Sequence, residues 1–155
     1  MAHTLDPALA SLPPRQLFTV LLWGECRGQP LLGQVAVACS IMNRLHFPEK
    51  YGETLWDVMT RWAQYSCLWP TLAGEANWGS VRHAAELLAD TPRSYLQPRL
   101  AALYTLAGLA MEHLLLDPTD GATHYHATSI APPSWATVSR QSARIGEHLF
   151  YRDVP

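Results

Sequence analysis

The sequence has little charge and no excess of either sign. Its 11 lysine and arginine residues face 13 aspartate and glutamate residues, so the formal net charge is −2 at pH 7. Scattered cations without a basic stripe argue against binding to nucleic acid or to an anionic membrane surface. Only 15% of the residues are charged and 48% are hydrophobic, which excludes a disordered tail or a solvated coiled coil. We expect 155 residues of this composition to form one globular core.

Cysteines and long apolar runs are also scarce. Cys26, Cys39 and Cys67 are odd in number and too far apart for a paired metal-ligand motif, so we expect reduced thiols that fill core volume. No apolar run is long enough to cross a bilayer, and membrane insertion is not expected. The N-terminus lacks a basic stretch followed by an apolar run, so we expect no signal peptide and a chain that is cytoplasmic as synthesised. We further expect a monomer without a cofactor.

Apolar periodicity predicts a mostly α-helical α+β domain. Residues 1–14, which contain three prolines, are interpreted as an N-terminal leader, and residues 15–155 as the single globular domain. The expected helices cover 15–26, a segment from Pro30 to near Asn43, 54–59, 80–88 with Ser80 as the cap, and a helix opened by Gln97 and Pro98 that should be the longest. Short strands at 123–126 and 148–151 predict a small C-terminal sheet.

Glu25 is the most informative residue. It ends the apolar pattern of the first helix, so it should lie against the core, where desolvation raises the pKa of a carboxylate. A proton held near neutral pH is what a general acid needs. Gly24 and Gly28 on either side of it would allow another backbone or a bulky ligand to come close. The alternative is an ion pair of Glu25 with Arg27 or Lys50 at the helix end.

Several short motifs together resemble the SleB-type cell wall hydrolases, which are spore-cortex-lytic enzymes and their bacteriophage relatives. In chain order the motifs are Gly24-Glu25-Cys26-Arg27-Gly28-Gln29-Pro30, Gly33 to Ala38 before Asn43-Arg44, Gln64-Tyr65-Ser66, Gly121 to His126, Trp135, and Ile145 to Tyr151. Each motif alone is weak, but the ordered set covers about residues 15 to 152 and is fairly specific. The family usually has alanine at the positions of Gly24 and Cys26, and phenylalanine at that of Tyr65.

The resemblance implies a lysozyme-like, lytic-transglycosylase-like fold that acts on peptidoglycan glycan strands. Glu25 matches the family's catalytic glutamate, which would protonate the bond between MurNAc and GlcNAc while the muramyl C6 hydroxyl closes a 1,6-anhydro ring. The expected substrate-binding residues are Gln64, Tyr65, Ser66, His124, Tyr125, His126 and Trp135. The chain would reach the wall after release, as a phage endolysin does.

Three alternatives remain open at this point. The same site could carry out muramidase-type hydrolysis. His124 and His126 alternate to one face of a strand and could form a zinc site with His148, which would make the chain a metal-dependent amidase or peptidase. A non-catalytic glycan-binding module would be equally rich in aromatic residues. A nucleophilic Cys26 is disfavoured, because a neighbouring carboxylate raises the pKa of a thiol.

Overall fold

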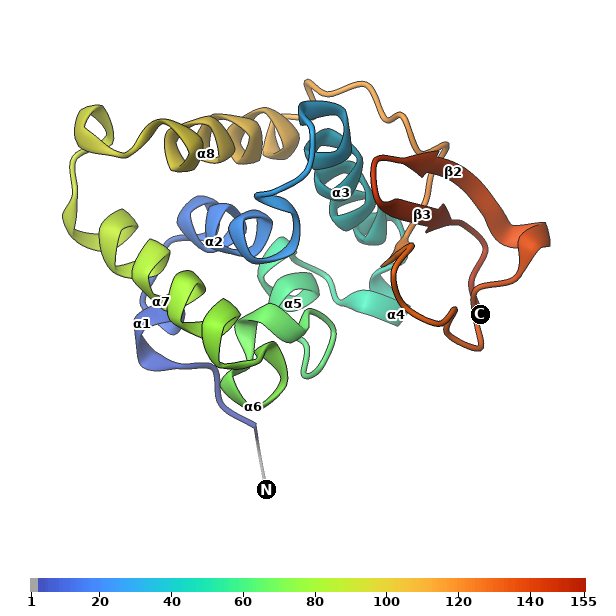
Figure 1. The fold of residues 1–155 in the computed structure, drawn as a ribbon, viewed down its shortest axis with the longest axis horizontal. Helices are drawn as coiled ribbons and strands as arrows, with labels where there is room; N and C mark the ends of the chain where they lie inside the picture. Colours follow the sequence, from blue (N-terminus) through green and yellow to red (C-terminus); the bar gives the residue numbers. More distant parts are fainter. Residues whose placement is uncertain (1–2) are drawn as a thin grey trace.

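The computed structural model describes residues 3–155 and consists of a helical body with a small sheet at one side (Figure 1). The α-helices are α1 (Pro7–Ala10), α2 (Pro14–Cys26), α3 (Leu31–Asn43), α4 (Pro48–Tyr51), α5 (Leu55–Thr60), α6 (Pro70–Ala73), α7 (Glu75–Asp90) and α8 (Pro98–Met111). The 3-10 helices are η1 (Arg44–His46), η2 (Ser66–Leu68), η3 (Arg93–Tyr95) and η4 (Val138–Arg140). The strands are β1 (His124–Ala127), β2 (Gln141–Ile145) and β3 (His148–Tyr151).

Helix α2 lies at the centre of the helical body and packs against α3, α7 and α8 (Figure 1). Leu17, Phe18 and every residue from Val20 to Leu22 are fully buried, which is typical of a helix surrounded by others. Pro14 occupies its first turn, where a missing N–H costs nothing. This central helix carries Glu25 in its last turn.

The predicted helices are confirmed at α2, α3 and α5, but two expectations about the later helices are wrong. Helix α7 begins at Glu75, five residues before Ser80, and its 16 residues exceed the 14 of α8. Gly74, at φ 73°, redirects the backbone just ahead of the helix. The Ser80 hydroxyl is not a cap, because it accepts a hydrogen bond from the indole N–H of Trp23 at 2.8 Å.

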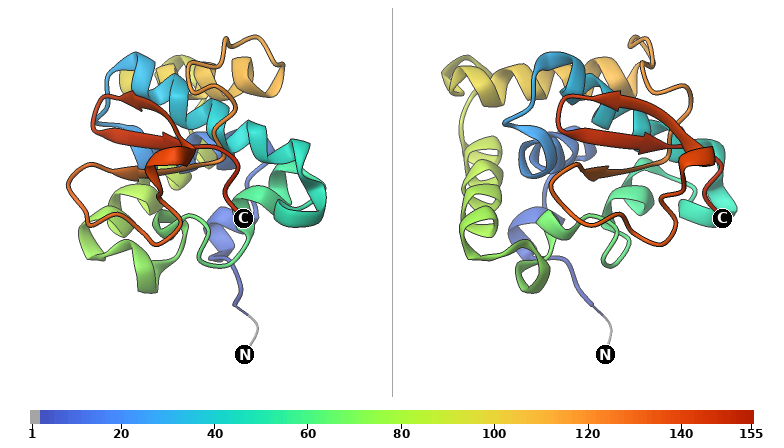
Figure 2. Two further views of the ribbon diagram at one scale, coloured as in Figure 1. Left: turned by 90° about the vertical axis from the view of Figure 1, so that its right-hand side faces the viewer. Right: turned by 45° about the vertical axis from the view of Figure 1, so that its right-hand side comes forward.

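The sheet is antiparallel with strand order β1-β3-β2 and lies in front of the helices when the molecule is turned by 90° (Figure 2, left). The predicted strands β1 and β3 are confirmed, whereas β2 was not predicted. In the β1–β3 register, Tyr125 pairs with Phe150 and Ala127 with His148. Side chains of paired residues share a face, so Tyr125, Phe150 and His148 lie on one face, opposite to His124 and His126.

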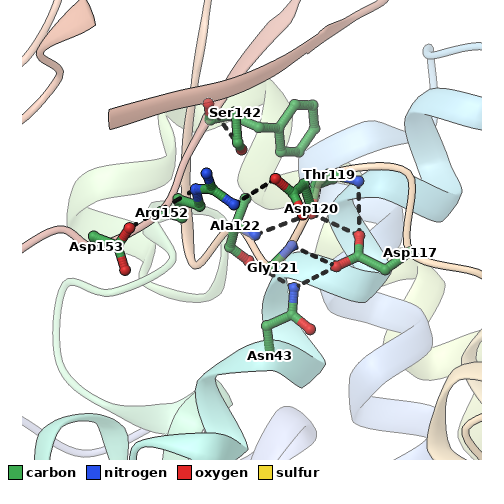
Figure 3. Close-up of polar contacts among 10 residues, drawn as sticks. Asn43, Asp117, Thr119, Asp120, Gly121, Ala122, Ser142, Arg152 and Asp153 are labelled. Carbon is green, nitrogen blue, oxygen red and sulfur yellow. Dashed lines mark hydrogen bonds and ion pairs between the residues drawn. The ribbon is translucent and has the colours of Figure 1, made fainter. Parts of the chain in front are cut away.

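The Asp117 carboxylate organises the connection from α8 to β1 (Figure 3). One oxygen accepts from the N–H and hydroxyl of Thr119 at 2.8 and 2.6 Å, and the other accepts from Gly121 N–H at 3.0 Å and the Asn43 amide at 2.9 Å. Burial alone would raise the pKa of Asp117, but these hydrogen bonds hold it below its ordinary value. The same Asn43 amide donates to Ala122 O at 2.9 Å, so the loop ties β1 to the end of α3.

The segment before residue 15 contributes to the core. Leu9 of α1 is fully buried and Leu12 is 4% exposed. The division of the chain at residue 14 stays a prediction. The three cysteines are buried free thiols, as expected. Among the described residues, none of the helices has the length and apolar character needed to cross a bilayer.

Candidate active site

Glu25 lies on an open groove of about 530 Å³ between the end of α2 and the start of α7. The groove is lined by Gly24, Glu25, Cys26, Arg27, Gly28, Gln29, Ala76 and Asn77. Cys26 is buried and Glu25 is half-buried, so the carboxylate sits at the boundary between the core and the groove. It is the one carboxylate among these lining residues, and it is therefore placed to exchange a proton with a bound molecule.

The ion pair considered as an alternative for Glu25 does not form. Within residues 3–155 no lysine, arginine or histidine nitrogen lies within 4.0 Å of its carboxylate. Arg27 instead donates to Trp23 O at 2.9 Å and to the Asn77 side chain at 2.8 Å. Lys50 donates to Val154 O.

Tyr125 is the direct partner of Glu25. Its hydroxyl donates to Glu25 Oε2 at 2.7 Å across 100 positions of sequence, so strand β1 presents a hydrogen-bond donor to the last turn of α2. Burial, together with the charge of Glu25, raises the pKa of Tyr125 well above its ordinary value. The phenol therefore stays protonated and orients the carboxylate.

The α2 backbone beside Glu25 is in close contact with η2. A Cβ added at Gly24 would lie 2.6 Å from both Cβ and Sγ of Cys67, so only glycine fits there. At Gly28, which lines the groove, an added Cβ would meet nothing within 4 Å among the described residues, so no other backbone comes close there. Close approach of a ligand at Gly28 stays a prediction. Burial and then the Glu25 charge raise the pKa of both Cys26 and Cys67, so neither thiol supplies a thiolate nucleophile.

Gln29 connects the groove to the β2–β3 hairpin. Its side-chain oxygen accepts from Glu147 N–H at 3.1 Å, and its amide donates to Glu147 Oε2 at 3.1 Å. Gly146, at φ 58°, brings the turn so close that an added Cβ would lie 2.6 Å from Gln29 Oε1. The hairpin is thus fixed next to Glu25, a contact that sequence patterns did not reveal.

Arg44 is a buried cation that the sequence patterns placed at a helix end and in one of the family motifs, without a role of its own. It is 3% exposed, its Nε donates to Thr123 O at 2.7 Å, and its guanidinium carbon lies 5.0 and 5.1 Å from the ring centres of Tyr51 and Tyr65. Arg44 therefore holds the backbone two residues before Tyr125. A charged residue directly after a strongly apolar helix is the signal that could have identified it.

Of the predicted binding triplet Gln64, Tyr65 and Ser66, Tyr65 packs against this cation. Tyr65 is 3% exposed, and its hydroxyl has no hydrogen-bond partner among the described residues. Gln64 is half-buried and Ser66 is exposed. None of the three lines the groove that contains Glu25, and their roles in binding a sugar stay predictions.

His124, His126 and Trp135 gather on the face of the sheet that points away from Tyr125. The Trp135 ring centre lies 4.9 Å from that of His124 and 6.0 Å from that of His126. Both ring nitrogens of His126 have partners, the Ala127 carbonyl at 2.8 Å and the Tyr151 hydroxyl at 3.0 Å. Burial, with Arg44 and Lys50 nearby, lowers the pKa of His124 to about 4, so it is neutral at pH 7. Their roles in binding a sugar also stay predictions.

The three histidines proposed for zinc are separated by the sheet. His124 and His126 share one face, whereas His148 pairs with Ala127 and packs its ring 5.4 Å from that of Tyr125 on the other. Among residues 3–155, no group of three or more His, Cys, Asp or Glu side chains is arranged to hold a metal ion. The register of β1 and β3 thus does not assemble the ligand set of the zinc alternative.

The fold and site together define a helical, lysozyme-like protein with one glutamate in a groove. Among solved structures, the catalytic domain of the Bacillus cereus SleB protein is similar, with a TM-score of 0.62 at 23% identity, covering 98% of this chain and 95% of that one. The catalytic domain of the germination-specific lytic transglycosylase SleB from Bacillus anthracis has a TM-score of 0.61 at 23% identity and covers 98% and 100%. The predicted fold is confirmed.

Sequence comparison leads to the same group. The pattern of the family described as Cell Wall Hydrolase matches residues 28–151, a span that begins three residues after Glu25. The spore cortex-lytic enzyme of Halalkalibacterium halodurans is 30% identical over 142 residues, covering 87% of this chain and 33% of that protein. The Bacillus subtilis spore cortex-lytic enzyme is 29% identical over 139 residues, covering 87% and 36%. The chain belongs to the cell wall hydrolase family, and it spans about a third of the length of these curated relatives.

Proposed function

We propose that this chain degrades peptidoglycan by cleaving the β-1,4 bond between MurNAc and GlcNAc as a lytic transglycosylase, with Glu25 as acid and then base. Membership of the cell wall hydrolase family and the likeness to the SleB catalytic domains support the substrate class. The observation that carries the mechanism is that Glu25 is the one carboxylate lining its groove and accepts a hydrogen bond from a neutral Tyr125.

The first chemical step is proton transfer to the leaving group. Protonated Glu25 gives its proton to the bridging oxygen as the bond to the muramyl C1 breaks, because an alkoxide is a poor leaving group. An oxocarbenium-like centre forms at C1, and Glu25 is left ionised. The Tyr125 hydroxyl, which donates to Oε2, stabilises this ionised carboxylate.

The second step is capture of the charged sugar by its own C6 hydroxyl. The C6 oxygen forms a bond to C1, its proton goes to Glu25, and the product is a 1,6-anhydro sugar with no water consumed. An intramolecular nucleophile has an entropic advantage over a free one. One carboxylate therefore suffices, whereas glycosidases that hydrolyse by the usual route place a second carboxylate about 5–9.5 Å from the first.

A Glu25→Gln variant tests the assignment. Glutamine keeps the shape of the side chain but cannot deliver a proton, so the rate of turbidity loss of purified walls should fall by at least ~100-fold, which is typical for the loss of a general acid. The variant should still sediment with walls. Retained activity would reject Glu25 as the acid, and wall binding by the wild type without any released fragment would instead indicate a binding module.

A further inference from the structure

A second cavity, of about 510 Å³, lies at the opposite end of α2 from Glu25. It is lined by Arg15, Arg93, Leu96, Ala101, Tyr104 and Thr105. Arg15 is in the first turn of α2, and the ten residues from there to Glu25 correspond to about 15 Å along the helix axis. Figure 1 shows η3 and the start of α8, which bound this cavity, at the edge of the molecule remote from the sheet.

The aromatic ring of Tyr104 is part of the cavity lining, and the guanidinium groups of two arginines lie close to it. The guanidinium carbon of Arg15 lies 4.0 Å from the centre of the Tyr104 ring, and that of Arg93 lies 4.1 Å from it. The two cations are therefore no more than about 8 Å apart, within the screening length of about 8 Å at physiological salt. At this separation they repel each other.

Neither arginine has an anionic partner in the described part of the chain. No Asp or Glu oxygen lies within 4.0 Å of Arg15 or Arg93 among residues 3–155. Arg15 is anchored, because its Nε and Nη2 donate to Tyr104 O at 3.0 and 2.9 Å. The Arg93 side chain is exposed and makes no hydrogen bond to another described residue, so all the N–H groups of its guanidinium are available.

Among the remaining polar groups of the lining, the Tyr104 hydroxyl can donate to an anion, because it has no hydrogen-bond partner among the described residues. The Thr105 hydroxyl already donates to Ala101 O at 3.1 Å. The lining contains no acidic and no amide side chain, while Leu96 and Ala101 supply its apolar part. Guanidinium groups match the planar oxygens of carboxylate and phosphate, and the volume is typical of small-ligand pockets, which span roughly 300–1,000 Å³.

We propose that Arg15, Arg93 and Tyr104 form an oxyanion-binding site that takes a carboxylate or phosphate group of a wall polymer. Its distance from Glu25 makes it a docking point remote from the bond that is cleaved. The identity of the polymer rests on the proposed function, whereas oxyanion binding itself does not.

Direct titration tests the binding site independently of activity. Wild-type protein titrated with inorganic phosphate, and separately with acetate, should show saturable shifts of backbone resonances around Arg93 and Ala101. Whichever of phosphate and acetate binds the wild type more tightly should bind Arg93→Gln with about tenfold lower affinity, because charge-assisted hydrogen bonds are lost. Arg82→Gln is the matched control, since Arg82 is an exposed arginine on α7 paired with Glu86. Absence of saturable binding to the wild type, or equal affinity of the two variants, would overturn the proposal.

Sedimentation with purified walls tests whether the site docks the protein on the wall. It also tests whether the wall group that binds there is a phosphate or a carboxylate. In the inactive Glu25→Gln background, adding Arg93→Gln should reduce wall binding several-fold, and adding Arg82→Gln should not. If chemical removal of wall phosphate abolishes the difference between the two double variants, phosphate is the ligand; if the difference persists, carboxylate is. Equal binding of the two double variants to untreated walls would refute docking, even where Glu25 proves to be the catalytic acid.

Discussion

The hydrogen bond from Tyr125 to Glu25 makes the most specific prediction about catalysis. Tyr125→Phe removes one oxygen, the donor that lies 2.7 Å from Glu25 Oε2, and leaves the ring that packs against Phe150. A hydrogen bond to a charged group contributes about 1.5–3 kcal/mol, which corresponds to roughly a 13- to 160-fold change in rate. Because Glu25 is half-buried and water can replace the phenol in part, we expect a loss near tenfold in kcat.

Rate and wall binding measured together distinguish a catalytic effect from a structural one. The Tyr125 hydroxyl contacts the carboxylate that transfers the proton, so its loss should lower kcat at every pH while leaving sedimentation with purified walls unchanged. The assay is the initial rate of turbidity loss of purified walls between pH 4 and 9. Tyr151→Phe is the matched control, because its hydroxyl contacts His126 Nε2 at 3.0 Å on the other face of the same sheet. The reasoning fails if Tyr125→Phe and Tyr151→Phe have the same profile.

Three further predictions address packing, acid stability and metal dependence. Gly24→Ala should lower the free energy of unfolding by about 1–3 kcal/mol through its clash with Cys67, whereas Gly28→Ala should change it by less than about 0.5 kcal/mol; equal thermal midpoints would contradict this. Asp117→Asn should cost about 1–2 kcal/mol at pH 7, a range reduced for the exposure of the carboxylate. Since the pKa of Asp117 is held below its ordinary value, its stabilisation is lost as the pH falls below about 4, and denaturant melts of wild type and variant should converge there. Treatment with a chelator should leave wall lysis unchanged, because His148 lies across the sheet from His124 and His126; loss of activity that zinc restores would revive the metal-dependent alternative.

Sequence patterns predicted those parts of the fold that depend on local periodicity. Apolar residues at helical spacing identified α2 and α3, and strand alternation placed His124 and His126 on a common face. Strand β2 was missed because Gln141 to Arg144 are polar or small and a register shift interrupts their pairing with β3.

The parts that could not be predicted are contacts between distant segments. Alternation in β1 puts Tyr125 and its neighbours on opposite faces, but it does not say which face turns toward α2. The proposed oxyanion-binding site likewise brings Arg15, at the start of α2, next to Arg93 and Tyr104, which lie about 80 residues or more later in the sequence. No local motif marks this contact.

Analysis of the reaction products in water enriched with heavy oxygen tests the central claim most directly. If Glu25 alone supplies and recovers the proton while the sugar closes on itself, wild-type protein will release muramyl ends in the 1,6-anhydro form without heavy oxygen, and Glu25→Gln will release almost none. Reducing ends labelled with heavy oxygen, or anhydro ends formed by Glu25→Gln at the wild-type rate, would contradict the account.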